Sequence, residues 1–280
     1  MTQSLNPLRA FFRQPAIYIR LPSDGQFWPP GSIDMPVNRE LPILPMTAMD
    51  EITYRTPDAL FNGAAIVSVV QSCIPSIKNA WNMPNCDLNT ILTAIRIASY
   101  GAMMEVDTTC EKCSTENNFE LDLKNLLDTL EAPDFSESVK HGDLEIYFQS
   151  VGYEKQTEIN LLQFEQQRVL AQLPNSDLSE EQKTKMLNDA IQAITKITVK
   201  AIRSSIVGIK TPQALVSEPD FIEDFLMNCD RQLYGEIRDH AIKIRAYDEF
   251  KPIKMKCSNC EHEYEQNFTL DTANFFGAAS

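Results

Sequence analysis

Residues Val106–Leu123 read VDTTCEKCSTENNFELDL, and residues Ile253–Asp271 read IKMKCSNCEHEYEQNFTLD. In each stretch a Cys-x-x-Cys motif lies between two short runs of β-prone residues. This pattern predicts a strand, a tight turn that presents two thiols, and a second strand. Two such hairpins facing each other supply the tetrahedral ligand set of a structural zinc site. We therefore predict one structural zinc site formed by Cys110, Cys113, Cys257 and Cys260.

The two motifs are far apart in the chain, because residues 114–256 lie between them. A zinc ribbon with a helical domain inserted between its halves accounts for this gap. Loop-closure entropy grows only logarithmically with loop length. A thiolate–zinc site, worth ~10–16 kcal/mol in small peptides, can therefore hold such distant segments together.

Other interpretations of the cysteines stay open. The two pairs could be unrelated, or one could be a redox pair, although a redox Cys-x-x-Cys usually begins a helix and neither pair here does. A catalytic zinc needs an open coordination position, which four cysteines do not leave. His262, beside the second motif, could replace a ligand. The other cysteines and histidines are interpreted as ordinary core or polar residues: Cys73, Cys86, Cys229, His141 and His240.

Composition and charge argue against nucleic acid and membranes as partners. The chain has 280 residues and a formal net charge of −14, which repels phosphate. The nearest approach to a basic patch is Arg9, Arg13 and Arg20, spread through a proline-rich segment. No apolar stretch of signal-peptide length is visible, and the longest uncharged run, Ala59–Ile77, is too polar to span a bilayer. Seven cysteines, four of them in paired motifs, then favour metal binding in a cytosolic protein.

Residues 1–45 are predicted to form an extended arm. Seven prolines between Pro15 and Pro45 exclude a continuous helix or a central strand. Aromatic side chains in this segment would be costly to leave in water, so an arm laid along a surface fits better than a disordered one. These aromatic residues are Phe11, Phe12, Tyr18, Phe27 and Trp28.

Residues 46–101 are predicted to form a helical core. Thr47 is a candidate N-cap, and Thr56-Pro57 is a second candidate helix start. Asp87 is a candidate cap of a further helix that ends at Gly101. Apolar residues at helical spacing form one face of the core: Ile66, Val69, Val70, Cys73 and Ile74.

Residues 102–153 are assigned to the first ribbon half and further strands, including Leu144–Phe148. Residues 154–250 are predicted to form a helical insertion. Ser179 is expected to cap its second helix, and its third helix is expected to be a single helix that includes Phe221 to Ile244. Residues 251–280 form the second ribbon half and a C-terminal tail. The predicted fold class is α+β, with a helical core, a split zinc-ribbon β module, a helical insertion and an extended N-terminal arm.

A series of short blocks resembles a known family. The blocks are LPILPMTAMDE (Leu41–Glu51), TPDAL (Thr56–Leu60), SCIP (Ser72–Pro75), DL (Asp87-Leu88), AIRIASYG (Ala94–Gly101) and CEKC (Cys110–Cys113). In this order they resemble the T4-type family of phage baseplate hub assembly chaperones, also described as baseplate hub subunits, of contractile-tailed phages. The resemblance covers roughly residues 38–130 and implies a role in building or forming the central hub of the tail baseplate, without catalytic residues.

We therefore expect a non-enzymatic phage tail baseplate hub protein or hub assembly factor with a structural zinc. Its expected partners are other phage tail and baseplate hub proteins, with the tape-measure protein as a candidate, bound through the arm and the helical surfaces. It would act in the host cytoplasm during assembly. Retention in the virion tail baseplate and formation of a homo-oligomer stay open.

Two other functions compete with this expectation. One is an acidic zinc-ribbon regulator that binds a protein of a transcription complex, and the other is a metalloenzyme subunit. The sequence contains no phosphate-binding glycine loop, nucleophile elbow or HExxH motif, which argues against an enzyme.

Overall fold

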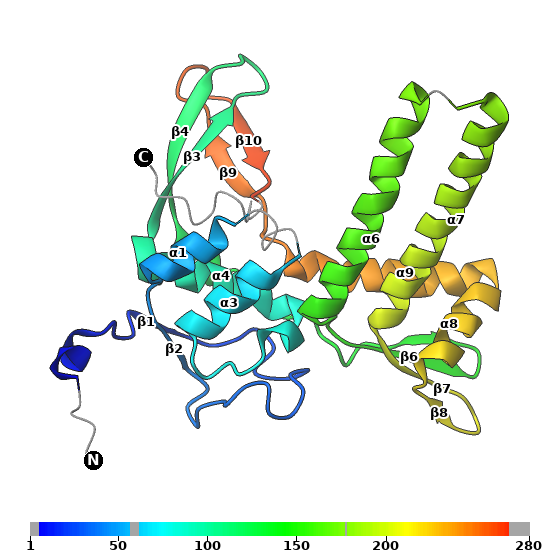
Figure 1. Cartoon of the computed structure of the whole chain (residues 1–280), viewed down its shortest axis with the longest axis horizontal. Coiled ribbons are helices and arrows are strands. Elements are labelled where there is room, and N and C mark those ends of the chain that lie inside the picture. Colours follow the sequence, from blue (N-terminus) through cyan, green and yellow to red (C-terminus); the bar gives the residue numbers. More distant parts are fainter. Residues whose placement is uncertain (1–5, 57–61, 177, 269–280) are drawn as a thin grey trace. The chain divides into compact units, whose positions relative to one another are not determined.

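The computed structural model of this chain describes residues 6–56, 62–176 and 178–268 (Figure 1). The chain divides into two compact units, each built from separate segments. Unit 1 comprises residues Met1–Ala80, Asp87–Glu131 and Glu249–Ser280, and unit 2 comprises Trp81–Cys86 and Ala132–Asp248. Thr56 is described, but Pro57 and the tail 269–280 lie outside the described residues.

Unit 1 combines helices with two-stranded antiparallel sheets. Its sheets pair β1 with β2, β3 with β4 and β9 with β10. Its elements are η1 (Pro7–Phe11), β1 (Ile17–Ile19), β2 (Leu41–Ile43), α1 (Ala48–Tyr54), α3 (Ala64–Cys73), most of α4 (Asn85–Tyr100), β3 (Met103–Thr109), β4 (Glu116–Asp122), α5 (Leu123–Leu127), β9 (Ile253–Lys256) and β10 (Glu263–Gln266).

The core of unit 1 forms where α3 and α4 bury their apolar residues. Val69 and Val70 of α3 are fully buried, as are Ile91 and Ile95 of α4. Thr47 caps α1 as expected, since its hydroxyl accepts from the Asp50 backbone N–H and the Asp50 carboxylate accepts from the Thr47 N–H. The predicted apolar face of residues 66–74 is therefore a buried helix face.

Asp87 does not cap α4, which corrects the expectation. The helix begins at Asn85, and the Asp87 carboxylate is fully buried in its first turn. It accepts hydrogen bonds from the Ser23 N–H (2.9 Å), the Ser23 hydroxyl (2.6 Å) and the Trp28 indole N–H (2.8 Å). Burial raises the pKa of Asp87 to about 6. Asp87 thus holds the proline-rich N-terminal segment against α4.

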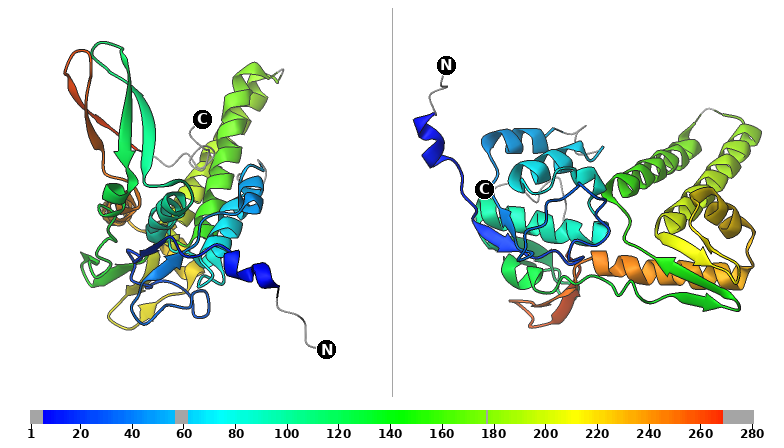
Figure 2. Two further views of the ribbon diagram at one scale, coloured as in Figure 1. Left: turned by 90° about the vertical axis from the view of Figure 1, so that its left-hand side faces the viewer. Right: turned by 90° about the horizontal axis from the view of Figure 1, so that it is seen from below.

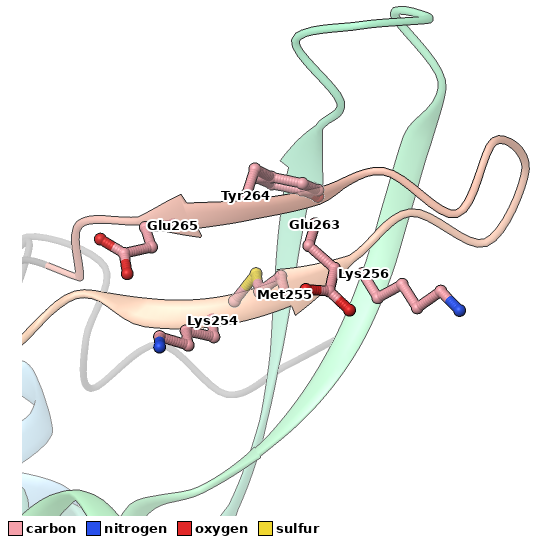
Figure 3. Close-up of a pocket in the computed structure, with 6 residues that line it drawn as sticks. All are labelled: Lys254, Met255, Lys256, Glu263, Tyr264 and Glu265. Carbon is pink, nitrogen blue, oxygen red and sulfur yellow. The ribbon is translucent and has the colours of Figure 1, made fainter.

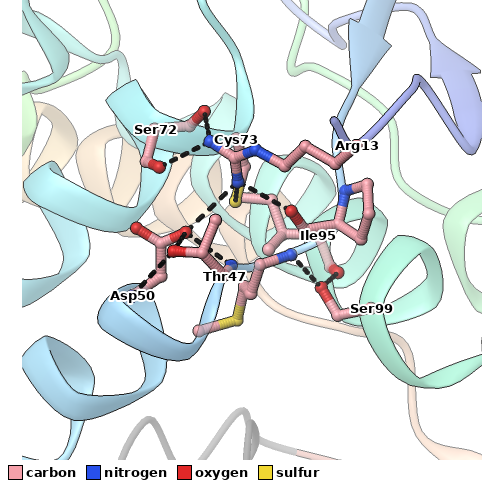
Figure 4. A network of polar contacts seen from close by, with 9 residues as sticks. Arg13, Thr47, Asp50, Ser72, Cys73, Ile95 and Ser99 are labelled. Carbon is pink, nitrogen blue, oxygen red and sulfur yellow. Dashed lines mark hydrogen bonds and ion pairs between the residues drawn. The ribbon is translucent and has the colours of Figure 1, made fainter. Parts of the chain in front are cut away.

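Arg13 holds the same segment at a second point (Figure 4). Its guanidinium donates to the carbonyl oxygens of Pro45 and Ser72, both at 2.7 Å, and to the Ser72 hydroxyl at 2.8 Å. It also forms an ion pair with Asp50 at 3.2 Å. Arg20 pairs with Glu40, so Arg9 alone of the three arginines has no ion pair among the described residues.

Unit 2 contains a four-stranded antiparallel sheet in the order β5-β6-β7-β8, with helices packed around it. Its apolar core includes the fully buried Ile146 of the sheet and Ile237 of a helix. Its elements are η2 (Ala80–Asn82, shared with unit 1), β5 (Val139–His141), β6 (Leu144–Phe148), α6 (Tyr153–Gln172), η3 (Leu173–Asn175), α7 (Glu180–Ser204), β7 (Ile206–Lys210), β8 (Leu215–Val216), α8 (Pro219–Asn228), α9 (Arg231–Arg245) and η4 (Ala246–Asp248).

Two features of this region differ from the sequence expectation. Residues 154–250, expected to form a helical insertion, contribute two strands, β7 and β8, to the sheet of unit 2. The expected single third helix is two helices, because Cys229 is extended and Asp230 starts α9 by accepting from the backbone N–H groups of Gln232 and Leu233. Ser179 caps α7 through a capping box, as expected.

The structure mixes helices with small antiparallel sheets, in agreement with an α+β class. Among the described residues, no helix combines the length and the apolar character needed to cross a bilayer.

We predict that Asp87→Ala lowers the free energy of unfolding by about 3 kcal/mol, because three buried donors lose their acceptor. Urea denaturation measures this loss. Asp34→Ala, which removes an exposed carboxylate paired with Lys78, is the matched control and should cost less than about 1 kcal/mol. Equal losses in the two variants would contradict the anchoring role.

Asp87 also predicts a pH dependence. Its pKa is about 6 in the folded protein against an ordinary value of 3.8, so the folded state binds more protons between these values. The stability that Asp87 contributes therefore falls as pH rises through this window, by about 3 kcal/mol in total. Relative to Asp87→Asn, the wild type should lose unfolding free energy from pH ~4 to ~6. A constant difference across this window would refute the shift.

Candidate metal centre

Two antiparallel hairpins carry the four predicted ligands. In the first, β3 and β4 pair from Met103↔Asp122 to Thr109↔Glu116, and Cys110 and Cys113 lie in the turn between them. In the second, β9 and β10 pair from Ile253↔Gln266 to Lys256↔Glu263, with Cys257 and Cys260 in the turn. Figure 1 and the left view of Figure 2 show the hairpins side by side.

The two turns have the same backbone geometry. The N–H of Ser114 donates to the carbonyl of Cys110, and the N–H of Glu261 donates to the carbonyl of Cys257. Both donors occupy the left-handed region, with φ of 55° and 56°. Each turn closes with a bond from the first cysteine's N–H, to Thr115 or to His262. Each Cys-x-x-Cys motif therefore folds into the same tight knuckle.

The four sulfur atoms converge on one point. The Sγ atoms of Cys110 and Cys260 are 3.7 Å apart, those of Cys113 and Cys257 are 3.6 Å apart, and all four lie within 4.8 Å of one another. Zinc–sulfur bonds of about 2.3 Å in a tetrahedron place sulfur atoms about 3.8 Å apart. A disulfide requires about 2.05 Å. The cysteines are free, and their spacing fits a single tetrahedral ion.

Asn117 connects the two hairpins beside the sulfur atoms. Its side-chain oxygen accepts from the N–H (2.9 Å) and the hydroxyl (2.8 Å) of Ser258, and its amide group donates to the Cys257 sulfur at 3.7 Å. The hydroxyl groups of Thr108 and Tyr264 form a second link, 2.6 Å long. Sequence reasoning missed Asn117, whose only signal was a polar residue inside a β-prone run.

Hydrogen bonds favour the thiolate forms of Cys113 and Cys257. The Thr115 hydroxyl, 3.2 Å from Cys113 Sγ, and the Thr115 backbone N–H lower the pKa of the Cys113 thiol to about 6. The backbone N–H of Cys260 lowers the pKa of the Cys257 thiol. The backbone of His262 acts in the same direction on Cys260, but the hydrogen bond with Cys113 and burial outweigh it and raise the pKa of the Cys260 thiol to about 12. Donors around ligating sulfur atoms orient them and stabilise the charge that metal binding requires.

The histidines lie outside this cluster, which consists of the four cysteines. The ring of His262 stacks beside Tyr264, with ring centres 6.3 Å apart. His141 contacts Glu236 at 3.0 Å, and His240 packs on Phe148.

A shallow recess of about 440 Å³ lies on the second hairpin (Figure 3). Its charged residues are cross-strand neighbours, Lys254 opposite Glu265 and Lys256 opposite Glu263, and the Lys256 ammonium forms an ion pair with Glu261 at 3.3 Å. Such cross-strand pairs stabilise a hairpin. Met255 and Tyr264, which also line the recess, pack in the apolar cluster around Cys110 and Cys257. The recess is therefore best explained as part of the hairpin's own packing.

Comparison with known proteins gives one match. A family model described as T4 bacteriophage base plate protein matches residues 37–277. The match spans both Cys-x-x-Cys motifs and all the chain between them. Neither the curated proteins nor the solved structures contain a match.

We predict that the purified protein binds about one zinc ion per chain, and that Cys257→Ser or Cys110→Ser abolishes stoichiometric binding. Loss of the metal should lower the free energy of unfolding by about 4 kcal/mol or more. Elemental analysis and urea denaturation measure the two effects.

Cys229→Ser is the matched control, since Cys229 is a half-buried free cysteine outside the cluster. It should retain the zinc and unfold close to wild type. Metal-free wild-type protein with unchanged stability, or a disulfide between the hairpins in the protein as isolated, would contradict the metal site.

Proposed function

This chain belongs to the T4 bacteriophage base plate protein family, and we propose that it is a subunit or assembly factor of the central baseplate hub. In this proposal it has no catalytic activity and binds other tail proteins, including hub proteins. It acts in the host cytoplasm during assembly. The exposed aromatic arm favours its retention in the virion, because extended arms form lasting interfaces by wrapping partners.

The observation that carries the proposal is the extent of the family match. Residues 37–277 include the N-terminal segment after Pro36, the helical core, both hairpins and the whole of unit 2. The family relationship therefore applies to the complete two-unit arrangement rather than to one motif, and a baseplate role is proposed for the protein as a whole.

We propose zinc as the ion that the four cysteines hold. Four thiolates at tetrahedral spacing are the donor set of structural zinc sites, and they leave no coordination position for a substrate. The ion would connect residues 110–113 to residues 257–260, the second and third chain segments of unit 1. Its role is to join the two segments of unit 1 that residues 132–248 of unit 2 separate in the chain.

The internal use of polar groups supports a non-enzymatic role. The buried Asp87 accepts three hydrogen bonds from the N-terminal segment, and Arg13 is engaged by Asp50 and by two backbone carbonyls. The hydrogen bonds of these groups all serve to hold the N-terminal segment in place. Perturbed titratable groups at active sites are instead poised towards a cleft.

Exposed apolar side chains support the partner-binding role. Large apolar residues clustered on a surface mark sites of protein association. In unit 1 several lie on the arm and on α1, and in unit 2 several lie on α7 and α8. Examples are Leu8, Phe11, Phe12, Met49 and Ile52 in unit 1, and Met186, Leu187, Ile191, Phe221 and Met227 in unit 2.

An affinity-tagged copy of the chain, isolated from cells that produce the phage, tests the proposal. We predict that tail baseplate proteins dominate the co-purified material identified by mass spectrometry. The Cys110→Ser/Cys257→Ser variant should recover about tenfold less of them, since loss of the metal disrupts unit 1.

Cys229→Ser is again the control and should recover the same partners as wild type. RNA polymerase subunits in place of tail proteins would support the competing transcription-regulator function and overturn the baseplate proposal. Absence of the chain from purified particles would reject the resident subunit and leave the assembly factor.

A further inference from the structure

The start of the arm presents apolar side chains that the rest of unit 1 does not cover. Beyond its anchor at Arg13, η1 stands off from the other elements of unit 1 (Figures 1 and 2). Leu8 is 62% exposed, Phe11 85% and Phe12 56%. Each large apolar side chain left in water forgoes the favourable free energy of burial. The η1 end of the arm is therefore suited to bind in an apolar pocket.

The geometry of η1 groups two of these side chains. Residues three apart eclipse each other in a 3-10 helix, so Leu8 and Phe11 share one side. Asn6 and Pro7 define the start of the helix, since the Asn6 side chain accepts from the Leu8 N–H. Arg9, next to Leu8, is exposed and has no ion pair among the described residues. The arm thus offers an apolar pair and a free positive charge.

Unit 2 contains a pocket with complementary properties. A cavity of about 240 Å³ lies between the sheet and α8, and Thr211 is the only polar residue that lines it. A cavity of about 150 Å³ suffices for a benzene ring, so this pocket can hold a phenylalanine side chain with room for part of a second. Its apolar lining residues are Leu144, Ile209, Val216, Phe221, Ile222 and Phe225.

The pocket is open at its edge, and the helix α8 that supplies part of its lining is acidic. Phe221 is 65% exposed at its edge, and the neighbouring β8 is the last strand of its sheet. Glu218, Asp220 and Asp224 lie at or on α8, and none of the three has an ion pair among the described parts of the chain. With a net charge of −14, two copies of this protein repel each other in general. An apolar pocket beside acidic residues is therefore suited to bind a segment that carries aromatic side chains and a positive charge.

We propose that the arm of one copy docks into the α8 pocket of a second copy. Leu8 and Phe11 enter the pocket, and Arg9 faces the carboxylates of Asp220 and Asp224. The contact joins two different surfaces, so it forms either a closed ring by exchange of arms or an open chain. This self-association goes beyond the proposed baseplate role and does not rest on the metal or on other tail proteins.

The purified full-length protein tests the proposal by analytical ultracentrifugation over a wide range of concentrations. Wild type should form reversible oligomers. Phe11→Ser and Phe221→Ser should each weaken association about tenfold or more, as truncation of a buried aromatic anchor does. Both side chains are exposed in the single chain, so neither change should unfold it. Val37→Ser and Met227→Ser, at exposed positions outside residues 6–12 and outside the pocket lining, should associate as wild type.

A mixing experiment identifies the contact. The Phe11→Ser protein retains a pocket and the Phe221→Ser protein retains an arm, so an equimolar mixture should form one-to-one complexes that neither forms alone. Arg9→Glu should weaken association, and Asp220→Lys/Asp224→Lys in a partner copy should restore it, since the charges are exchanged.

Three results would overturn the inference. They are a wild type that is monomeric at every concentration, variants that associate as strongly as wild type, and a mixture that remains monomeric. If Phe221 is shielded from solvent to the same extent at every protein concentration, the pocket is occupied by the arm of the same chain. This result would also refute the proposed contact between two copies. Whether the Phe11→Ser variant still captures tail proteins is measured separately. Failure of the self-association proposal can therefore be distinguished from failure of the baseplate proposal.

Discussion

Four sulfur atoms within 4.8 Å of one another join two hairpins that residues 114–256 separate in the chain. Unit 1 depends on this convergence because its chain segments are not continuous. Backbone pairing holds each hairpin internally, but β3-β4 and β9-β10 form separate sheets. The hydrogen bonds between the hairpins therefore involve side chains, and among them are Asn117 with Ser258, Thr108 with Tyr264, and Asn259 with Thr115, beside the four sulfur atoms. A metal that binds all four sulfurs is the strongest of these links.

A similar principle governs the N-terminal segment. Its prolines prevent a long strand or helix, so its backbone pairing is short: β1 with β2, and the isolated bridge between Ile33 and Ile77. Two polar side-chain contacts add to this pairing, Asp87 with Ser23 and Trp28, and Arg13 with the carbonyls of Pro45 and Ser72. Beyond Arg13 there is no comparable anchor among the described residues, and the apolar side chains of η1 are left exposed.

The spacing of the cysteines and the helix caps could be read from the sequence because these signals are local. Thr47 and Ser179 cap helices by bonds three residues away, and each knuckle is complete within six residues. The position of Asp87 could not be predicted, since an acid in a first turn is normally a cap, and its partners lie about 60 residues away. β7 follows α7 after one residue and continues its apolar pattern, so only pairing with β6 identifies it as a strand. Asn117 was missed for the same reason, because its role depends on a distant loop.

The discontinuous build of unit 1 has a mechanical consequence. The described segments before residue 81 and after residue 248 belong to unit 1, and so do residues 87–131, which precede the long segment of unit 2. With a metal bound, tension applied to the two ends passes from residues 110–113 to residues 257–260 through sulfur–metal bonds. The 143 residues from Ser114 to Lys256 carry none of that load while the site is intact. In a machine that contracts, residues 132–248 of unit 2 would be sheltered from forces that pull on the polypeptide, whereas Trp81–Cys86 of the same unit would stay on the loaded path.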